Sequence, residues 1–113
     1  KIEDKESDLL NSKFGVIGLE SSFSYSYKIL SQHGFSIEDV IDLFTVKPSR
    51  IMGIDLDLIE KDKSANFIVI NPDVDWTFDE KDISSMSKNS CLIGKLMKAK
   101  IDLVACKNKI HTI

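Results

Sequence analysis

Phe14-Gly15-Val16-Ile17-Gly18-Leu19-Glu20 is the stretch around which the chain is organised. Two glycines three residues apart lie in an apolar run, and Ser21 and Ser22 follow at once. Glycine adopts backbone angles that strain other residues, and serine is favoured just before the first turn of a helix. The stretch therefore predicts a loop whose bare backbone can approach a ligand, although the same spacing also occurs in ordinary turns.

Length and composition restrict the classes of protein that fit. The 113 residues suffice for one domain, and the net charge of −3 leaves no broad basic surface for nucleic acid. No apolar run approaches the roughly 20 residues of a membrane-spanning helix, and no signal-peptide pattern opens the chain. Cys91 and Cys106 lack metal-like spacing, which favours two reduced, partly buried thiols. We expect a cytoplasmic protein without nucleic-acid or membrane partners.

The start of the chain indicates a fragment or a processed product. It does not begin with Met, and Lys1–Asp8 is mostly charged. A surface loop is expected over Lys1–Lys13, because this segment is polar and acidic with one pair of leucines.

A first helix is predicted after the glycine stretch. Phe23, Tyr27 and Leu30 fall at helical spacing, and Gly34 can end the helix in a left-handed conformation. Phe23, Tyr25 and Tyr27 also alternate with serines, which would suit a strand. The glycine stop and the apolar continuation favour the helix.

A second helix is the clearest element of the sequence. Ser36 is a candidate N-cap with Asp39 at its third helical position, as in a capping box. The helix should end near Lys47, because the proline that follows disfavours a helical residue before it. A short turn over Pro48–Met52, closed by Gly53, is expected next. The apolar face of this helix comprises Ile37, Val40, Ile41 and Phe44.

The second half of the chain is rich in strand signals. Phe67–Ile70 is a short apolar run closed by Asn71-Pro72, typical of a buried strand. Asp73 and Asp75 then precede a second short segment, Trp76–Phe78. These two carboxylates either share a site or act as turn residues, and turn residues are the more common case.

The end of the chain predicts a long loop and a hairpin. Ile83–Ser90 is polar and serine-rich, whereas Leu96–Cys106 is apolar with charged interruptions. Lys107-Asn108 can turn the chain into Ile110–Ile113 as a β-hairpin. Helices come first and strands second, which favours an α+β fold over a repeated βαβ pattern.

Five separated motifs carry a resemblance to a known family. The motifs are Phe14–Ser21, Lys47–Gly53, Ala65–Val69, Asp75–Phe78 and Ser87–Gly94. Each is weak alone, but their order and spacing resemble the C-terminal part of a dihydroorotase of the amidohydrolase superfamily.

The resemblance implies an architecture larger than this sequence. Residues 1–53 would form the C-terminal end of a (β/α)8 catalytic barrel, including its last loop and helix. Residues 54–113 would form the C-terminal part of a small β-sandwich, completed by strands from the missing N-terminal portion of the same protein. A barrel of this type takes about 250 residues, so the chain would be an α+β fragment.

The resemblance also implies an activity. Dihydroorotases use zinc for reversible hydrolysis and formation of the cyclic amide of dihydroorotate in pyrimidine synthesis. The family's zinc ligands and catalytic residues lie upstream, so no metal ligand or catalytic residue is assigned here; His33 and His111 match no ligand position. Phe14 and Gly15 match the step that contacts the ring of the small-molecule substrate through the backbone. The fragment alone would be inactive.

Departures from the family pattern leave alternatives open. Asp57 and Asp62 stand where the family has glycines, and Asn66 replaces an acid. These changes fit an inactive homologue that acts as a scaffold for aspartate carbamoyltransferase. Another cyclic-amide hydrolase, such as an allantoinase or hydantoinase, also fits. An unpaired sheet along Phe67–Ile70 would bind the missing portion or another copy of the chain, or aggregate.

Overall fold

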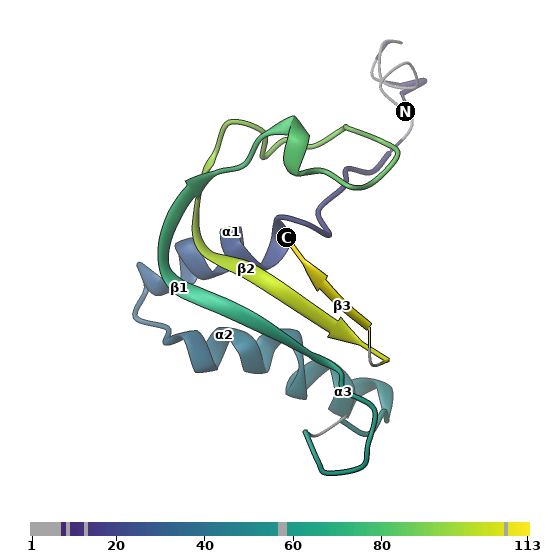
Figure 1. The fold of residues 1–113 in the computed structure, drawn as a ribbon. Coiled ribbons are helices and arrows are strands. Elements are labelled where there is room, and N and C mark those ends of the chain that lie inside the picture. The colour runs from purple at the N-terminus through teal and green to yellow at the C-terminus, as the bar shows by residue number, and fades with distance from the viewer. Residues whose placement is uncertain (1–7, 9, 13, 57–58, 108) are drawn as a thin grey trace.

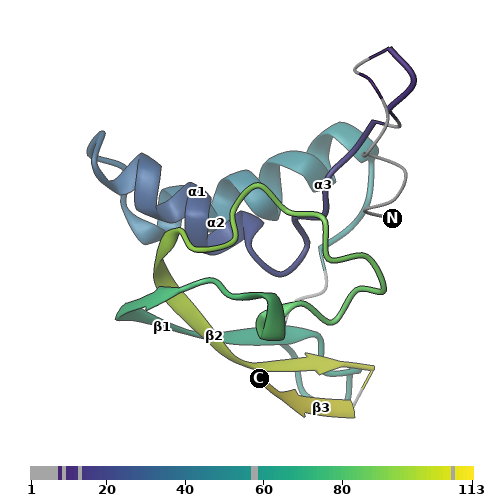
Figure 2. The same cartoon turned by 90° about the horizontal axis from the view of Figure 1, so that it is seen from above.

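A computed structural model describes residues 8, 10–12, 14–56, 59–107 and 109–113. Three α-helices lie on one side of a three-stranded antiparallel sheet, as Figures 1 and 2 show. The predicted α+β class, with helices before strands, is confirmed. The expected loop over Lys1–Lys13 lies largely outside the described residues, as do Asp57 and Asn108.

Helix α1 (Ser22–Ser31) confirms the first predicted helix and rules out the strand alternative. Phe23 is buried, and its ring contacts that of Phe44 edge to face at 5.6 Å between centroids. Gly34 has the predicted left-handed conformation, with φ of +85°. The helix is thus held by the apolar stripe that the sequence indicates.

Helix α2 (Ile37–Phe44) has the predicted capping box. The Asp39 N–H donates to the Ser36 hydroxyl at 3.2 Å, and the Ser36 N–H donates to the Asp39 carboxylate at 2.9 Å. These two bonds satisfy donors that the first turn of a helix otherwise leaves unpaired.

The junction after α2 differs from the prediction. The helix ends at Phe44 rather than near Lys47, because Thr45 leaves helical geometry at φ −126° and ψ −77°. Helix α3 (Val46–Met52) then begins two residues before the expected start at Pro48. Proline is tolerated there, since the N–H groups of a first turn have no partner within the helix. Gly53 ends α3, as predicted, and it does so in a left-handed conformation.

Strand β1 (Phe67–Thr77) is continuous, whereas the sequence predicted two segments separated at Asn71-Pro72. β1 lies at the edge of the sheet, and its pairing with β2 shifts register between Asn71 and Asp75. Proline is compatible with an edge strand and with such an irregularity, because it lacks the N–H of a regular ladder. The prediction of a buried strand was also wrong, since Ile68 and Val69 are nearly half exposed.

The predicted C-terminal hairpin is confirmed. Strand β2 (Leu96–Cys106) pairs antiparallel with β1 and with β3 (Lys109–Thr112), so the sheet order is β1-β2-β3. Lys107, at the described side of the connecting turn, has φ of +48°. The two thiols do not fit the expected partial burial, because both Cys91 and Cys106 are exposed.

A bulge at Ala99 ties the helices to the sheet. Ala99 is fully buried, has φ of +63° and takes no partner in the register between β1 and β2. Its carbonyl oxygen accepts a hydrogen bond from the Ser24 hydroxyl at 2.7 Å and another from the Trp76 indole N–H at 3.0 Å. Ala99 also packs with Phe23 and Val40 in the first core cluster. One backbone carbonyl therefore links α1, β1 and β2.

A second core cluster lies beneath the long loops. Phe78, Ile83 and Met97 are buried together, and Ile17 and Leu92 pack against them. This cluster brings the glycine stretch and the loop of residues 83–95 into contact with the sheet.

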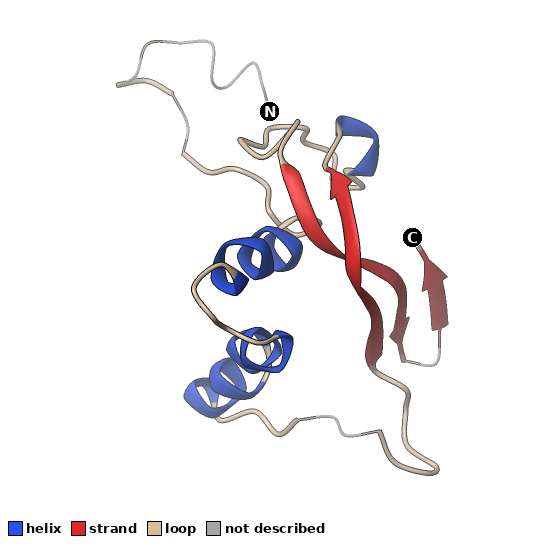
Figure 3. Ribbon diagram, turned by 90° about the vertical axis from the view of Figure 1, so that its left-hand side faces the viewer, coloured by secondary structure: helices blue, strands red, loops and turns tan. Residues whose placement is uncertain are grey.

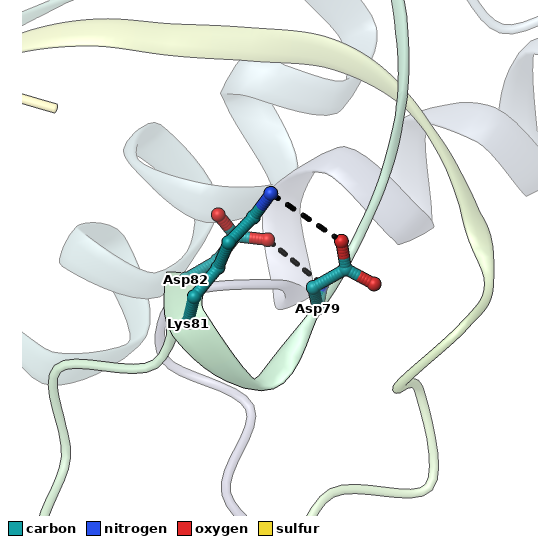
Figure 4. Close-up of polar contacts among 3 residues, drawn as sticks. All are labelled: Asp79, Lys81 and Asp82. Atoms are coloured by element: carbon teal, nitrogen blue, oxygen red, sulfur yellow. Dashed lines mark hydrogen bonds and ion pairs between the residues drawn. The ribbon is translucent and has the colours of Figure 1, made fainter.

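A short 3₁₀-helix, η2 (Glu80–Asp82), begins the loop region after β1. The Asp79 N–H donates to the Asp82 carboxylate at 2.7 Å, and the Lys81 ammonium lies 3.6 Å from the Asp79 carboxylate. Figure 4 shows these contacts closing the turn. They fix the direction in which the chain enters the loop.

The sheet face opposite the α-helices is covered by none of them, as Figure 3 shows. Apolar side chains of both edge strands are exposed, among them Ile68, Val69 and Ile110. Apolar side chains of a sheet are usually buried against a second layer of secondary structure, so their exposure here is unusual. The placement within a barrel and a sandwich, and the division after residue 53, stay predictions.

Two further observations concern the described part of the chain. Asp62 adopts φ of +66°, so the connector keeps a glycine-like turn although an aspartate occupies it. No helix in the described ranges is long and apolar enough to cross a membrane.

Candidate functional site

The glycine loop, residues 14–20, is joined to Asn89 by two hydrogen bonds. The Asn89 side-chain amide donates to the Gly15 carbonyl at 3.0 Å. The Ile17 N–H donates to the Asn89 backbone carbonyl at 2.9 Å. The loop ends where the Gly18 carbonyl accepts from the N–H groups of Ser21 and Ser22, and α1 begins. The predicted loop before a helix is confirmed.

The backbone conformation at residue 15, rather than close packing around it, explains why a glycine occupies this position. Its φ is +100°, and a Cβ built on it meets no atom within 4 Å. A side chain there would be strained by the backbone angle and would occupy the open space beside the loop. Phe14 is fully exposed on one side of this glycine, and Val16 is largely exposed on the other.

Two backbone groups of the glycine loop have no hydrogen bond to the residues that the structure describes. Among the residues that the structure describes, no hydrogen bond uses the Phe14 carbonyl or the Gly15 N–H. These two groups belong to one trans peptide, so the acceptor and the donor point in opposite directions from an exposed loop. The predicted contact of Phe14 and Gly15 with substrate stays a prediction.

Glu20 fastens the end of the glycine loop to the 83–95 loop. One carboxylate oxygen, Oε1, accepts from the Ser84 N–H, the Ser85 N–H and the Ser85 hydroxyl at 2.9 to 3.0 Å. Burial by itself raises the pKa of the Glu20 carboxyl, but these hydrogen bonds to the charged form outweigh it, so the pKa lies below its ordinary value. The two loops are therefore joined at both ends of the glycine stretch.

Sequence reasoning missed the roles of Asn89 and Glu20. Both lie inside motifs that carry the family resemblance, Ser87–Gly94 and Phe14–Ser21. Local periodicity gives no sign of either contact, because Asn89 meets Gly15 across 74 positions and Glu20 meets Ser85 across 65. Their positions within these motifs were the one feature of the sequence that could have indicated a role for Asn89 and Glu20.

The described residues do not fit a metal site. No three His, Cys, Asp or Glu side chains in these ranges are grouped so that they could hold a metal ion. His33 and His111 are exposed, and so are Asp73 and Asp75 on β1. Both aspartates lie within strand β1 rather than in the turn that the sequence favoured.

Comparison with known proteins gives one consistent result. The Amidohydrolase family matches residues 7–112. The chain is similar to the dihydroorotases of Chlorobaculum tepidum (33% identity over 98 residues, 86% of this chain and 22% of that protein) and Caldicellulosiruptor saccharolyticus (28% over 109 residues, 96% and 25%). It is also similar to that of Aquifex aeolicus (30% over 87 residues, 77% and 21%). The chain thus spans about a quarter of the length of these relatives. Since the family match covers nearly every residue, the chain belongs to the amidohydrolase family.

Proposed function

We propose that this chain is the C-terminal part of a dihydroorotase, which hydrolyses and forms the cyclic amide of dihydroorotate in pyrimidine synthesis. The similarity to dihydroorotases carries this proposal. In the Caldicellulosiruptor protein it extends over 96% of the chain, so it includes both the glycine loop and the loop that anchors it.

The geometry of the glycine loop suits a substrate of this class. A cyclic amide presents an N–H and a C=O on one edge of its ring. The Gly15 N–H forms no bond among the described residues and can donate to the ring carbonyl, whereas the Phe14 carbonyl belongs to the same trans peptide and points the opposite way. The open space at Gly15 lets a flat ring approach the backbone, which a Cβ would hinder.

We propose zinc as the cofactor of the whole protein, held by residues outside this sequence. The described residues contribute the substrate loop and its anchors, and no catalytic step is assigned to them.

The remaining portion of the same protein is the proposed partner of the uncovered sheet face. Ile68 and Val69 of β1 are nearly half exposed, and among the described residues β1 pairs with another strand on one side alone. An added strand would pair with that edge and bury these side chains. The relatives extend about four times the length of this chain, so they include ample sequence for such strands.

The first test is made on the full-length native protein. Its intact mass, zinc content and turnover of dihydroorotate are measured together. Bound zinc with turnover supports the proposal. A zinc-free, inactive protein that co-purifies with aspartate carbamoyltransferase would establish the scaffold instead, and turnover of allantoin or a hydantoin alone would establish a different cyclic-amide hydrolase.

The role of the glycine loop is tested by Gly15→Ala, with Gly34→Ala as the matched control. Both glycines have positive φ and open surroundings, so both substitutions impose similar backbone strain. Only Gly15 lies beside the proposed substrate. We expect kcat/KM for dihydroorotate to fall at least tenfold in Gly15→Ala and to stay within twofold in Gly34→Ala. Equal effects of the two substitutions would refute substrate contact at Gly15.

A further inference from the structure

Asn89 holds both ends of a three-residue span of the glycine loop. Its side-chain amide donates to the Gly15 carbonyl at 3.0 Å, and its backbone carbonyl accepts from the Ile17 N–H at 2.9 Å. Because the two bonds fall on either side of Val16, they fix the direction of the backbone on both sides of that residue.

Packing does not hold this part of the loop. The side chains of Phe14 and Val16 are exposed, and the position of a Cβ at Gly15 is open. The side chain of Ile17, by contrast, packs on the second core cluster. Among the described residues, the bond from the Asn89 amide is the hydrogen bond that holds the Gly15 carbonyl.

Asn89 is itself held by its own loop. The Asn89 N–H donates to the Ser87 hydroxyl at 3.3 Å, and the Lys88 ammonium donates to the Ile83 carbonyl. Ile83 is buried in the second core cluster, and Ser85 binds Glu20. Because Asn89 is held near the buried core in this way, its hydrogen bonds can keep the exposed backbone at Gly15 in a fixed position relative to the core.

We propose that Asn89 is a positioning residue, which holds the backbone at Gly15 so that the Gly15 N–H is directed toward the substrate ring. The inference rests on the proposed function and adds a residue to it. The Gly15 carbonyl needs a donor at this position, and an ionised aspartate has no N–H to give and sets a negative charge against that oxygen.

The test compares Asn89→Asp with Asn71→Asp in the full-length protein. The two substitutions make the same chemical change, but the Asn71 side chain accepts its bond, from the Asp73 N–H, and an aspartate can still accept it. Hydrogen exchange of residues 14–19 and the values of KM and kcat for dihydroorotate are measured, with zinc content and melting temperature as checks of folding.

We expect Asn89→Asp to speed exchange at Ile17 about fivefold to tenfold, which corresponds to losing one hydrogen bond. KM should rise by a similar factor with kcat within twofold, because a backbone contact to the ring acts on bound substrate and transition state alike. Asn71→Asp should change neither quantity.

The inference is overturned if exchange and KM in Asn89→Asp match the wild type. A variant with faster exchange and an unchanged KM would also overturn it, since the loop would then move without affecting the substrate. If the wild type itself does not turn over dihydroorotate, the proposed function fails, whereas the exchange measurement still decides whether Asn89 holds the loop.

Discussion

Replacing Ser24 and Trp76, singly and together, tests whether the Ala99 carbonyl joins the helices to the sheet. This carbonyl belongs to a fully buried residue and accepts from Ser24 at 2.7 Å and from Trp76 at 3.0 Å. Either donor alone keeps the oxygen hydrogen-bonded. Removing both leaves a buried acceptor without a side-chain partner, so the two losses should not add.

The expected magnitudes follow from the number of bonds left to the oxygen. Ser24→Ala removes one buried hydrogen bond and should lower the free energy of opening of the sheet by about 1 kcal/mol. Trp76→Phe removes the other bond and some packing volume, for about 1–2 kcal/mol. The double variant leaves the buried carbonyl without either side-chain donor, which should cost a further loss of about 1–3 kcal/mol beyond the sum.

Native-state hydrogen exchange of the β1 and β2 amides is the suitable assay. It reports the local opening free energy of these strands whatever other domains are present. A coupling of 1.4 kcal/mol appears as a tenfold excess in exchange over the product of the single effects. Additive losses, or no loss in Ser24→Ala, would refute the role assigned to the Ala99 carbonyl.

Two other predictions concern carboxylates that accept hydrogen bonds from backbone N–H groups. Ser36→Ala should destabilise α2 by about 1 kcal/mol, seen as faster amide exchange in α2, whereas Ser36→Thr keeps the cap; equal exchange in both variants would contradict this role. Hydrogen bonds to Ser36 lower the pKa of Asp39 below 3.8, so the bond from the Ser36 N–H to the Asp39 carboxylate is at full strength above that pH and weakens as the pH falls through the lowered pKa. Glu20→Gln should speed exchange at Ser84 and Ser85 at neutral pH. Burial raises the pKa of Glu20, but its hydrogen bonds outweigh that effect, so the wild type should reach the same state only as the pH falls through a pKa below 4.5. Protection of Ser84 and Ser85 that does not change with pH, after correction for the intrinsic exchange rate, would argue against the charged anchor.

Features set by neighbouring residues could be read from the sequence. The capping box of Ser36 and Asp39 involves residues three positions apart, and both of its hydrogen bonds are present. The positive φ values of Gly34 and Gly53 follow from the same short-range logic. Helix α1 and the C-terminal hairpin were likewise indicated by local spacing and turn residues.

Features that depend on a partner strand were predicted less well. Asn71-Pro72 carries a strong turn signal, yet β1 continues through it, because the proline lies where the register with β2 shifts. The expected burial of Phe67–Ile70 depended on a covered sheet, whereas the helices of this chain cover one side of it. At both places the tertiary environment, rather than the local turn or strand propensity, decides the structure.

The sequence by itself determined helix α1, helix α2 with its capping box, the strand-rich second half and the loop at Phe14-Gly15, because residues within a few positions of one another decide these features. Tertiary structure alone decided that Asn89 reaches Gly15, that Glu20 binds Ser84 and Ser85, and that Ala99 turns its carbonyl toward α1. Each of those contacts joins residues more than sixty positions apart, and a hydrogen bond between them forms only when the packed core holds both partners within about 3 Å.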